Sequence, residues 1–257
     1  MPEPVLNLFV LYQEEVPPPL SLELPDGPQF KVRQLLPPFP SLQGHLGENG
    51  QPVTPEERKV AAGAKGGLHV RCDDGEEPAA RLHNCARLMQ RCFDAGAVAI
   101  VLPAAFKILG PRELRALAPA LAGTDLRARD AYLRLFTHTY VLHDDQHAWT
   151  HTHGLEHFGL PDFECRTPVK DLRIAEQLIL AAIHFLFDEG DTSLNEGNVV
   201  EAESEDGRFI GLAHVVASRP LEGHDYGYWG ALQLVHDPSV TAPRGKKVTP
   251  PGPRPRS

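Results

Sequence analysis

The sequence predicts an α+β fold, with a mixed or mainly antiparallel sheet and about three helices packed on it. Three observations lead to this prediction. Short apolar segments rich in β-branched and aromatic residues are separated by turn residues, which is typical of strands. Three longer segments carry apolar residues at helical spacing. The most regular of these, over residues 169–189, follows a segment whose pattern indicates a central β-hairpin.

The length and composition fit a globular protein. The chain has 257 residues, of which 42% are hydrophobic and 23% are charged, which is ordinary for a folded domain and sufficient for a sizeable core. We expect a single α+β domain over residues 1–241, in which residues 1–60 are Pro-rich and form peripheral strands and a loop. Residues 242–257 carry five basic residues and no acid, and we expect them to be a disordered, basic, Pro-rich tail.

The charge balance narrows the classes of partner. The net charge is −9, and the tail contributes +5, so the remainder of the chain carries −14. Such a body repels phosphates, which argues against a nucleic-acid partner. Apolar runs stay below the roughly 18 residues of a membrane-spanning helix, so we expect no membrane partner and a cytoplasmic location. The four cysteines contain no C-x-x-C spacing and are expected to be reduced.

The N-terminal half is expected to supply strands and two helices. Prolines limit its first segments to edge strands or coil, and Gly96 is placed to end a helix by adopting a left-handed conformation. The apolar segment after Gly96 suits a strand covered on both faces and completes a strand-helix-strand unit. In chain order, the expected elements are a buried strand over 5–12, edge segments over 20–24 and 30–36, a surface loop over 37–58, a strand over 67–72, a helix from about 76 to 96, a strand over 97–102 and a helix over 111–122.

The C-terminal half centres on the predicted hairpin. Residues 131–142 and 146–153 are rich in Thr, Tyr, Val, Phe and Trp, with Asp144-Asp145 as the loop. This register places Tyr140 opposite Trp149 and His138 opposite His151 on one face. The helix over 169–189 buries one apolar stripe and ends at Gly190. Further strands are expected over 198–202, 208–216 and 227–236, with a turn at 205–207.

A histidine-rich stretch contains one metalloenzyme string. His153-Gly-Leu-Glu156-His157 matches the H-x-x-E-H pattern of inverted zincins. That chemistry needs both histidines on a stable helix. Gly154 lies inside the string, however, and Gly159 and Pro161 close it within four residues. The sequence therefore argues against protease-type zinc chemistry at this position.

The hairpin offers a second interpretation of the same histidines. His138, Tyr140, Trp149, His151 and His153 form a candidate ligand-binding or functional surface on one hairpin face. A metal-dependent alternative uses four histidines and a divalent ion such as zinc, the ligands being His138, His151, His153 and His157. The competing interpretation is structural, because an amphipathic imidazole packs well on a sheet surface. Without the metal, no cofactor is expected.

The segment Thr152-His-Gly-Leu-Glu-His-Phe-Gly-Leu-Pro-Asp-Phe-Glu164 carries a family resemblance. It resembles the T-x-G-[LM]-x-x-F-G-x-P-[ED]-[LF]-E signature of a bacterial family, domain of unknown function 4261. The resemblance implies an α+β domain and a bacterial cytoplasmic protein, and it carries no catalytic residue. Four residues of the signature have a structural explanation. Gly154 and Gly159 allow tight bends of the backbone, Phe158 is an apolar anchor, and Pro161 ends any helix that precedes it.

These observations favour a non-enzymatic function. No nucleophile elbow, phosphate loop or dinucleotide-binding motif is present in the sequence. We therefore expect an interaction or regulatory protein, of an immunity-like kind, that binds another protein. The alternative is the metal-binding protein or metal-dependent hydrolase described above. A third interpretation is a small-ligand module in which Tyr140, Trp149 and Trp229 form an aromatic surface.

Overall fold

The computed structural model describes residues 6–15, 30–37, 39, 55–72, 78–121, 126–188, 194–204, 206–218 and 230–241. The predicted segment 20–24 and the predicted tail 242–257 lie outside these residues. The fold is α+β, as predicted, but it contains two sheets and two compact units. Unit 1 comprises residues 1–138 and 153–159, and unit 2 comprises residues 139–152 and 160–257.

The sheet of unit 1 has five strands, and every neighbouring pair is antiparallel. Its order is β2-β3-β1-β4-β5, so the first strand of the chain lies in the middle. Because β3 and β4 both pair antiparallel with β1, they run parallel to each other, and the helix between them completes the predicted strand-helix-strand unit. The strands are β1 (Leu6–Tyr12), β2 (Lys31–Leu35), β3 (Gly66–Cys72), β4 (Ala99–Leu102) and β5 (Lys107–Leu109).

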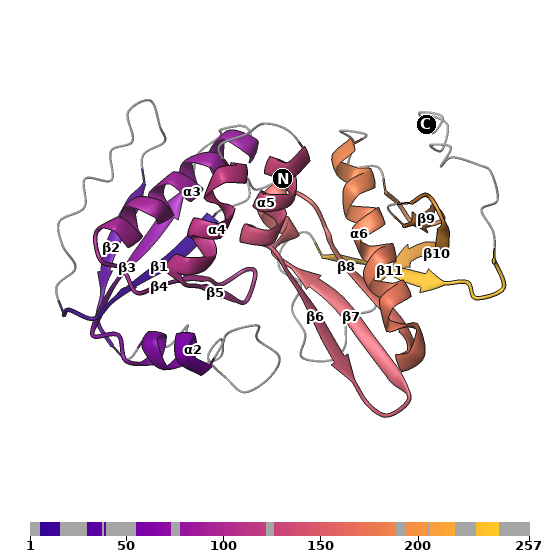
Figure 1. Ribbon diagram of the computed structural model, residues 1–257, viewed down its shortest axis with the longest axis horizontal. Coiled ribbons are helices and arrows are strands. Elements are labelled where there is room, and N and C mark those ends of the chain that lie inside the picture. Colours follow the sequence, from indigo (N-terminus) through magenta and orange to yellow (C-terminus); the bar gives the residue numbers. More distant parts are fainter. Residues whose placement is uncertain are drawn as a thin grey trace, which may run out of the picture. The chain divides into compact units, whose positions relative to one another are not determined.

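Helices cover both faces of this sheet (Figure 1). On one face, Leu8 and Val10 of β1 pack in a cluster with residues of α3 (Pro78–Asp94), α4 (Pro111–Leu121) and α5 (Leu126–Phe136). On the other face, Leu11 of β1 packs with Ala61 of α2 (Pro55–Ala62). The alternation of β1 side chains between two helical layers explains why nearly every residue of this strand is apolar.

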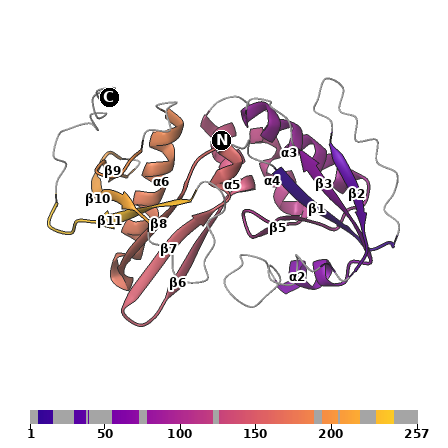
Figure 2. The ribbon, with the colours of Figure 1, turned by 180° about the vertical axis from the view of Figure 1, so that it is seen from behind.

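The second sheet belongs to unit 2 and has six strands in the order β6-β7-β8-β11-β10-β9. Only the β8–β11 pair is shown to be parallel, so this sheet is mixed. Figure 2 shows α6 (Leu172–Asp188) from behind, alongside the strands that it contacts, which are β8 to β11. The strands are β6 (His138–His143), β7 (His147–His153), β8 (Asp162–Pro168), β9 (Val199–Glu203), β10 (Phe209–Ala217) and β11 (Ala231–His236).

Several elements match the sequence-based expectations, and four do not. The hairpin, the long helix and the three C-terminal strands are confirmed. Residues 126–136, part of which were predicted as the first hairpin strand, form α5, and residues 55–62, part of which were predicted as loop, form α2. Strands β5 and β8 were not predicted. The hairpin loop is also one residue later, since Asp144 N donates to His147 O, which shifts the cross-strand partners by two residues.

The signature segment forms the expected sharp corner. Gly154 has φ of 95° and Gly159 has φ of 73°, and the 3-10 helix η1 (Leu155–Phe158) lies between them. A Cβ atom on Gly154 would lie 2.4 Å from Phe136 O, so this glycine is required by close packing as well as by its backbone angle. Phe158 is partly buried and packs against the core of unit 1. No described helix is long and apolar enough to cross a membrane.

Candidate functional site

Three of the predicted surface residues form a stack inside unit 2. The ring of His151 stacks on Tyr140 at 5.5 Å and on Trp149 at 4.0 Å between centroids. All three side chains are buried, and His151 is only 2% exposed. Burial raises the pKa of the Tyr140 hydroxyl. The structure therefore brings these residues together, but as an internal layer and not as a surface. Trp229 lies outside the described residues.

A buried carboxylate completes this layer. Glu164 of β8 is paired with His151 across the sheet and is fully buried. Its Oε2 accepts a hydrogen bond from Trp149 Nε1 at 2.8 Å and lies 3.6 Å from Arg166 Nη2, while its Oε1 accepts from Ser218 Oγ at 3.0 Å. Both carboxylate oxygens are thus held by donors within unit 2, as a buried acidic group requires. The network orients Trp149 and joins three segments of the unit.

The other predicted histidines lie in unit 1. His153 is buried with its ring 4.5 Å from that of Phe106, whose φ of 49° is the only positive value among described non-glycine residues. His157 is buried beside Phe136, and its backbone oxygen accepts a hydrogen bond from Arg81 Nη2 at 3.0 Å. Burial, and secondarily the charge of Arg81, lowers the pKa of His157 to about 4.

The metal hypothesis is not supported by this arrangement. His138 is half-buried, and its pKa is lowered to about 4 by burial and by the neighbouring Lys107. His151 packs in unit 2, whereas His138, His153 and His157 pack in unit 1. Within the part of the chain that the structure describes, no three His, Cys, Asp or Glu side chains gather closely enough to hold a metal ion. The four histidines therefore do not form one ligand set.

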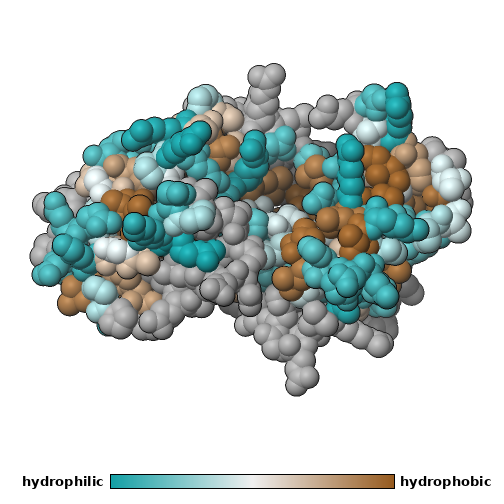
Figure 3. Space-filling model, turned by 60° about the horizontal axis from the view of Figure 1, so that its bottom comes forward, coloured by the Kyte–Doolittle hydropathy of each residue, from teal (hydrophilic) through white to brown (hydrophobic). Residues whose placement is uncertain are grey.

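A few large apolar side chains are exposed on the described surface. On the face shown in Figure 3, apolar residues reach the surface between polar ones. The exposed large hydrophobic residues are spread over several elements, and scattered residues of this kind are normal on globular proteins. They are Val32, Leu36, Val60, Leu142, Val169, Leu180 and Val235.

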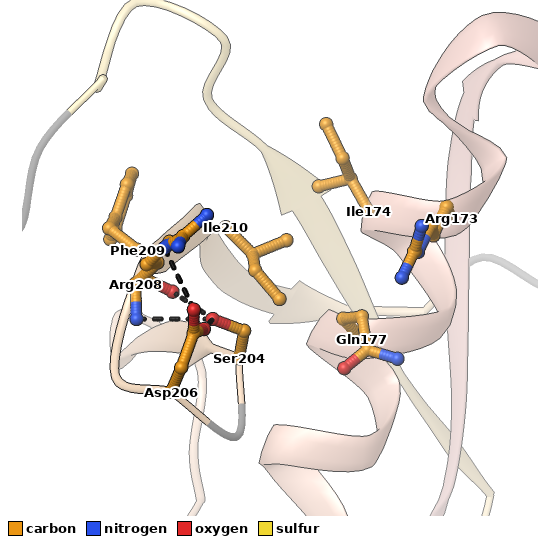
Figure 4. Close-up of a pocket in the computed structure, with 8 residues that line it drawn as sticks. All are labelled: Arg173, Ile174, Gln177, Ser204, Asp206, Arg208, Phe209 and Ile210. Carbon is orange, nitrogen blue, oxygen red and sulfur yellow. Dashed lines mark hydrogen bonds and ion pairs between the residues drawn. The ribbon is translucent and has the colours of Figure 1, made fainter.

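An open cleft of unit 2 combines apolar and charged side chains. It lies between the N-terminal part of α6 and the turn that joins β9 to β10, and its volume is about 420 Å³. We call it the α6–β10 cleft. The helix contributes Arg173, Ile174 and Gln177, and the turn and strand contribute Ser204, Asp206, Arg208, Phe209 and Ile210 (Figure 4).

The apolar part of the cleft depends on an irregularity in β10. Phe209 pairs with Glu203, but Gly211 pairs with Ala202, so Ile210 is the extra residue of a β-bulge. The bulge turns Ile210 toward α6, as Figure 4 shows. A Cβ atom on Gly211 would lie 2.8 Å from Ile174 Cγ2. The missing side chain of Gly211 therefore allows Ile174 to lie directly on β10.

The turn that forms one wall is internally bonded. Asp206 pairs with Arg208 Nε at 2.8 Å and accepts a hydrogen bond from the Ser204 hydroxyl. The Ser204 hydroxyl oxygen in turn accepts from Arg208 N at 3.1 Å. Asp206 and Arg208 thus offset each other's charge. These bonds hold the wall of the cleft in place. The Ser204 hydroxyl both donates and accepts a hydrogen bond within the turn.

The opposite wall offers free donors. Arg173 is exposed at the start of α6, and among the described residues no carboxylate lies within ion-pair distance of its guanidinium. Gln177 lies one turn further along the same helix face. Because Asp206 and Arg208 are paired, Arg173 is the charged residue without an ion-pair partner among the described residues that line the cleft. The cleft can therefore bind an acidic group beside an apolar one.

Sequence reasoning found the elements of this cleft but not the cleft itself. The helix over 169–189 and the turn at 205–207 were both predicted. The apolar stripe assigned to the helix omitted Ile174, which is only partly buried and lines the cleft. The sequence does not predict the bulge at Ile210, because the residues around it have the pattern of a regular strand. The available indication in the sequence was an apolar residue, Ile174, that lies off the main stripe and next to Arg173.

Comparison of the chain with models of known protein families, with curated proteins and with solved structures found no match.

Proposed function

We propose that this protein is a non-enzymatic interaction protein that binds another protein through the α6–β10 cleft. The cleft carries this proposal, because it sets the cation of Arg173, which has no ion-pair partner among the described residues, beside the partly exposed apolar side chains of Ile174, Phe209 and Ile210. Protein recognition sites commonly combine apolar anchors with arginine. The proposal keeps the regulatory role expected from the sequence and assigns the binding to one location.

The chemistry of the cleft supports binding over catalysis. Activation of a serine nucleophile needs a free hydroxyl and an adjacent base. The Ser204 hydroxyl instead donates to Asp206 and accepts from Arg208 N, so it is committed to the turn. The residues that remain available to a partner are donors and apolar groups. This set recognises a ligand and leaves it unchanged.

Capture by cleft variants tests the proposal. Immobilised protein is incubated with a lysate of the source organism, and the bound polypeptides are compared for the wild type, Arg173→Glu and Ile210→Asp. Lys170→Glu and Leu180→Asp are matched controls, since both residues are exposed in unit 2 and do not line the cleft. We expect the cleft variants to retain about a tenth or less of the polypeptide that the wild type and controls capture. Equal capture by all five proteins would refute the proposal.

A further inference from the structure

We propose that the α6–β10 cleft receives the C-terminal residue of its partner, a free α-carboxylate with an apolar side chain. This inference rests on the proposed binding function and specifies the chemical group that the cleft recognises. Two features of the cleft support it, namely a positive charge on one wall that has no ion-pair partner among the described residues, and the apolar residues that surround it. The C-terminal residue of a polypeptide can match both features, because it carries a negative carboxylate and an apolar side chain.

The charge on α6 selects an anion. Arg173 presents a planar guanidinium, which pairs with a carboxylate through two parallel hydrogen bonds. Gln177 follows at the i+4 position on the same face and also lines the cleft. Its amide group can donate a further hydrogen bond to the same acid. The paired Asp206 faces Arg208 and leaves the charge of Arg173 available.

The apolar residues distinguish a chain end from an acidic side chain. Ile174 and Ile210 extend from opposite walls, and Phe209 lies beside Ile210 (Figure 4). The side chain of Asp or Glu reaches its carboxylate through one or two methylene groups and leaves these apolar residues uncovered. A C-terminal Leu, Ile or Phe carries the carboxylate and a large apolar side chain on one Cα atom. Burial of such a side chain stabilises a complex because it removes apolar surface from water.

The size of the cleft suits this occupant. Its volume of about 420 Å³ lies at the lower end of the roughly 300–1,000 Å³ that is typical of ligand sites. This space accommodates a terminal residue, and Arg208, whose side chain is 84% exposed, marks the side that opens to solvent. The preceding residues of the partner can leave the cleft there.

Nuclear magnetic resonance titration tests the inference with defined peptides. The probes are the hexapeptide Gly-Ser-Gly-Ser-Gly-Leu with a free carboxylate, the same peptide as its C-terminal amide, and Gly-Ser-Gly-Asp-Gly-Ser amide. We expect the free acid to shift the backbone resonances of Ile174, Gln177 and Ile210 and to bind at least about tenfold more tightly than either amide. Equal affinity for the acid and its amide would overturn the inference, as would shifts confined to other elements.

Variants identify the groups responsible. Arg173→Gln should remove the preference for the free acid, and Ile210→Ser should weaken binding of the leucine peptide while leaving a small preference for its acid form. Lys170→Gln is the matched control and should behave as the wild type. If the acid preference persists in Arg173→Gln, the assignment of the carboxylate to Arg173 is wrong.

The two proposals fail separately. If cleft variants lose the captured partner but no peptide acid binds at up to about 5 mM, the binding function stands and the chain-end inference falls. If the peptide acid binds in the cleft but capture is equal for all variants, the cleft recognises chain ends and the captured protein binds elsewhere. In the second case the chain-end preference is retained as a property of the cleft alone.

Discussion

At the scale of single residues, His157 shows how burial changes a titrating group. It is 1% exposed, and neither ring nitrogen has a hydrogen-bond partner within the described part of the chain. Its pKa falls from 6.5 to about 4 because burial penalises the charged form and Arg81 repels it. The sequence offered His157 as a zinc ligand. The structure assigns it to the interior of unit 1, which no local pattern reveals.

The pH dependence of stability follows from this lowered pKa. Between pH 6.5 and 4 the unfolded chain binds a proton at His157 that the folded chain does not, so the free energy of unfolding falls as the pH is lowered. At pH 5 this residue should cost about 2 kcal/mol relative to pH 7. Urea unfolding at both pH values should show that His157→Leu loses less stability on acidification than the wild type by this amount. An identical loss in both proteins would contradict the assignment.

The two glycines of the corner provide a matched pair. A Cβ atom on Gly154 meets Phe136 O at 2.4 Å and Ala105 Cβ at 2.9 Å, whereas one on Gly159 meets nothing within 4 Å. Both have positive φ. We expect Gly159→Ala to cost about 1 kcal/mol for backbone strain alone, and Gly154→Ala to cost roughly 3 kcal/mol or more. Thermal melting measures the difference, and equal losses would show that the corner relaxes freely.

At the scale of elements, β8 depends on polar pairs. It was missed in the sequence because its buried positions include Asp162 and Glu164, which break the apolar alternation of a strand. Their partners come from elsewhere, since Thr152 Oγ1 bonds to Asp162 at 3.0 Å and Trp149 Nε1 bonds to Glu164. A strand stabilised by such pairs becomes recognisable only once its neighbours are known.

Removal of the Glu164 carboxylate tests the importance of these pairs. Glu164→Ala leaves the indole N–H of Trp149 and the Ser218 hydroxyl without their acceptor in a buried layer, which should destabilise unit 2 by about 2–4 kcal/mol. Glu203→Ala, at the exposed end of β9, should change stability by about 0.5 kcal/mol or less. Chemical unfolding compares the two. A loss for Glu164→Ala as small as that for Glu203→Ala would mean that the network contributes little.

The assignment of part of α5 to a strand has a different cause. In residues 131–136 the apolar residues Ala131, Leu133, Leu135 and Phe136 nearly alternate, and they run into the true strand that starts at His138. Short apolar runs fit both periods, so α5 was taken as strand. By contrast, α6 was predicted correctly because its stripe extends over several turns. Long periodic segments are therefore predictable here, and short ones depend on tertiary contacts.

At the scale of the whole molecule, the chain crosses between its two units more than once. Unit 1 takes residues 153–159 from the far side of the hairpin, and these residues contact α3. The composition does not indicate that residues 153–159 belong to unit 1. No linker-like segment separates the two units, and the sequence predicts one domain over residues 1–241. The elements were thus largely predictable, but their division between two sheets was not.

Truncation tests the interleaved organisation. A fragment of residues 1–138 lacks the corner that packs on α3, including the carbonyl of His157 that accepts from Arg81. We expect this fragment to melt at least about 4 °C below a fragment of residues 1–160, as followed by circular dichroism. Equal melting temperatures would show that the corner contributes little to unit 1.

The central claim is that a partner protein binds in the α6–β10 cleft, and photocrosslinking tests it most directly. A photoreactive benzoylphenylalanine is placed at Gln177, which lines the cleft, or at the adjacent Glu176, which is exposed and does not. Consecutive helical positions differ by about 100° in direction, so the pair samples two faces of one helix. We predict that the captured partner is crosslinked from position 177 and not from 176. Crosslinking from 176 alone, or equally from both, would contradict the account.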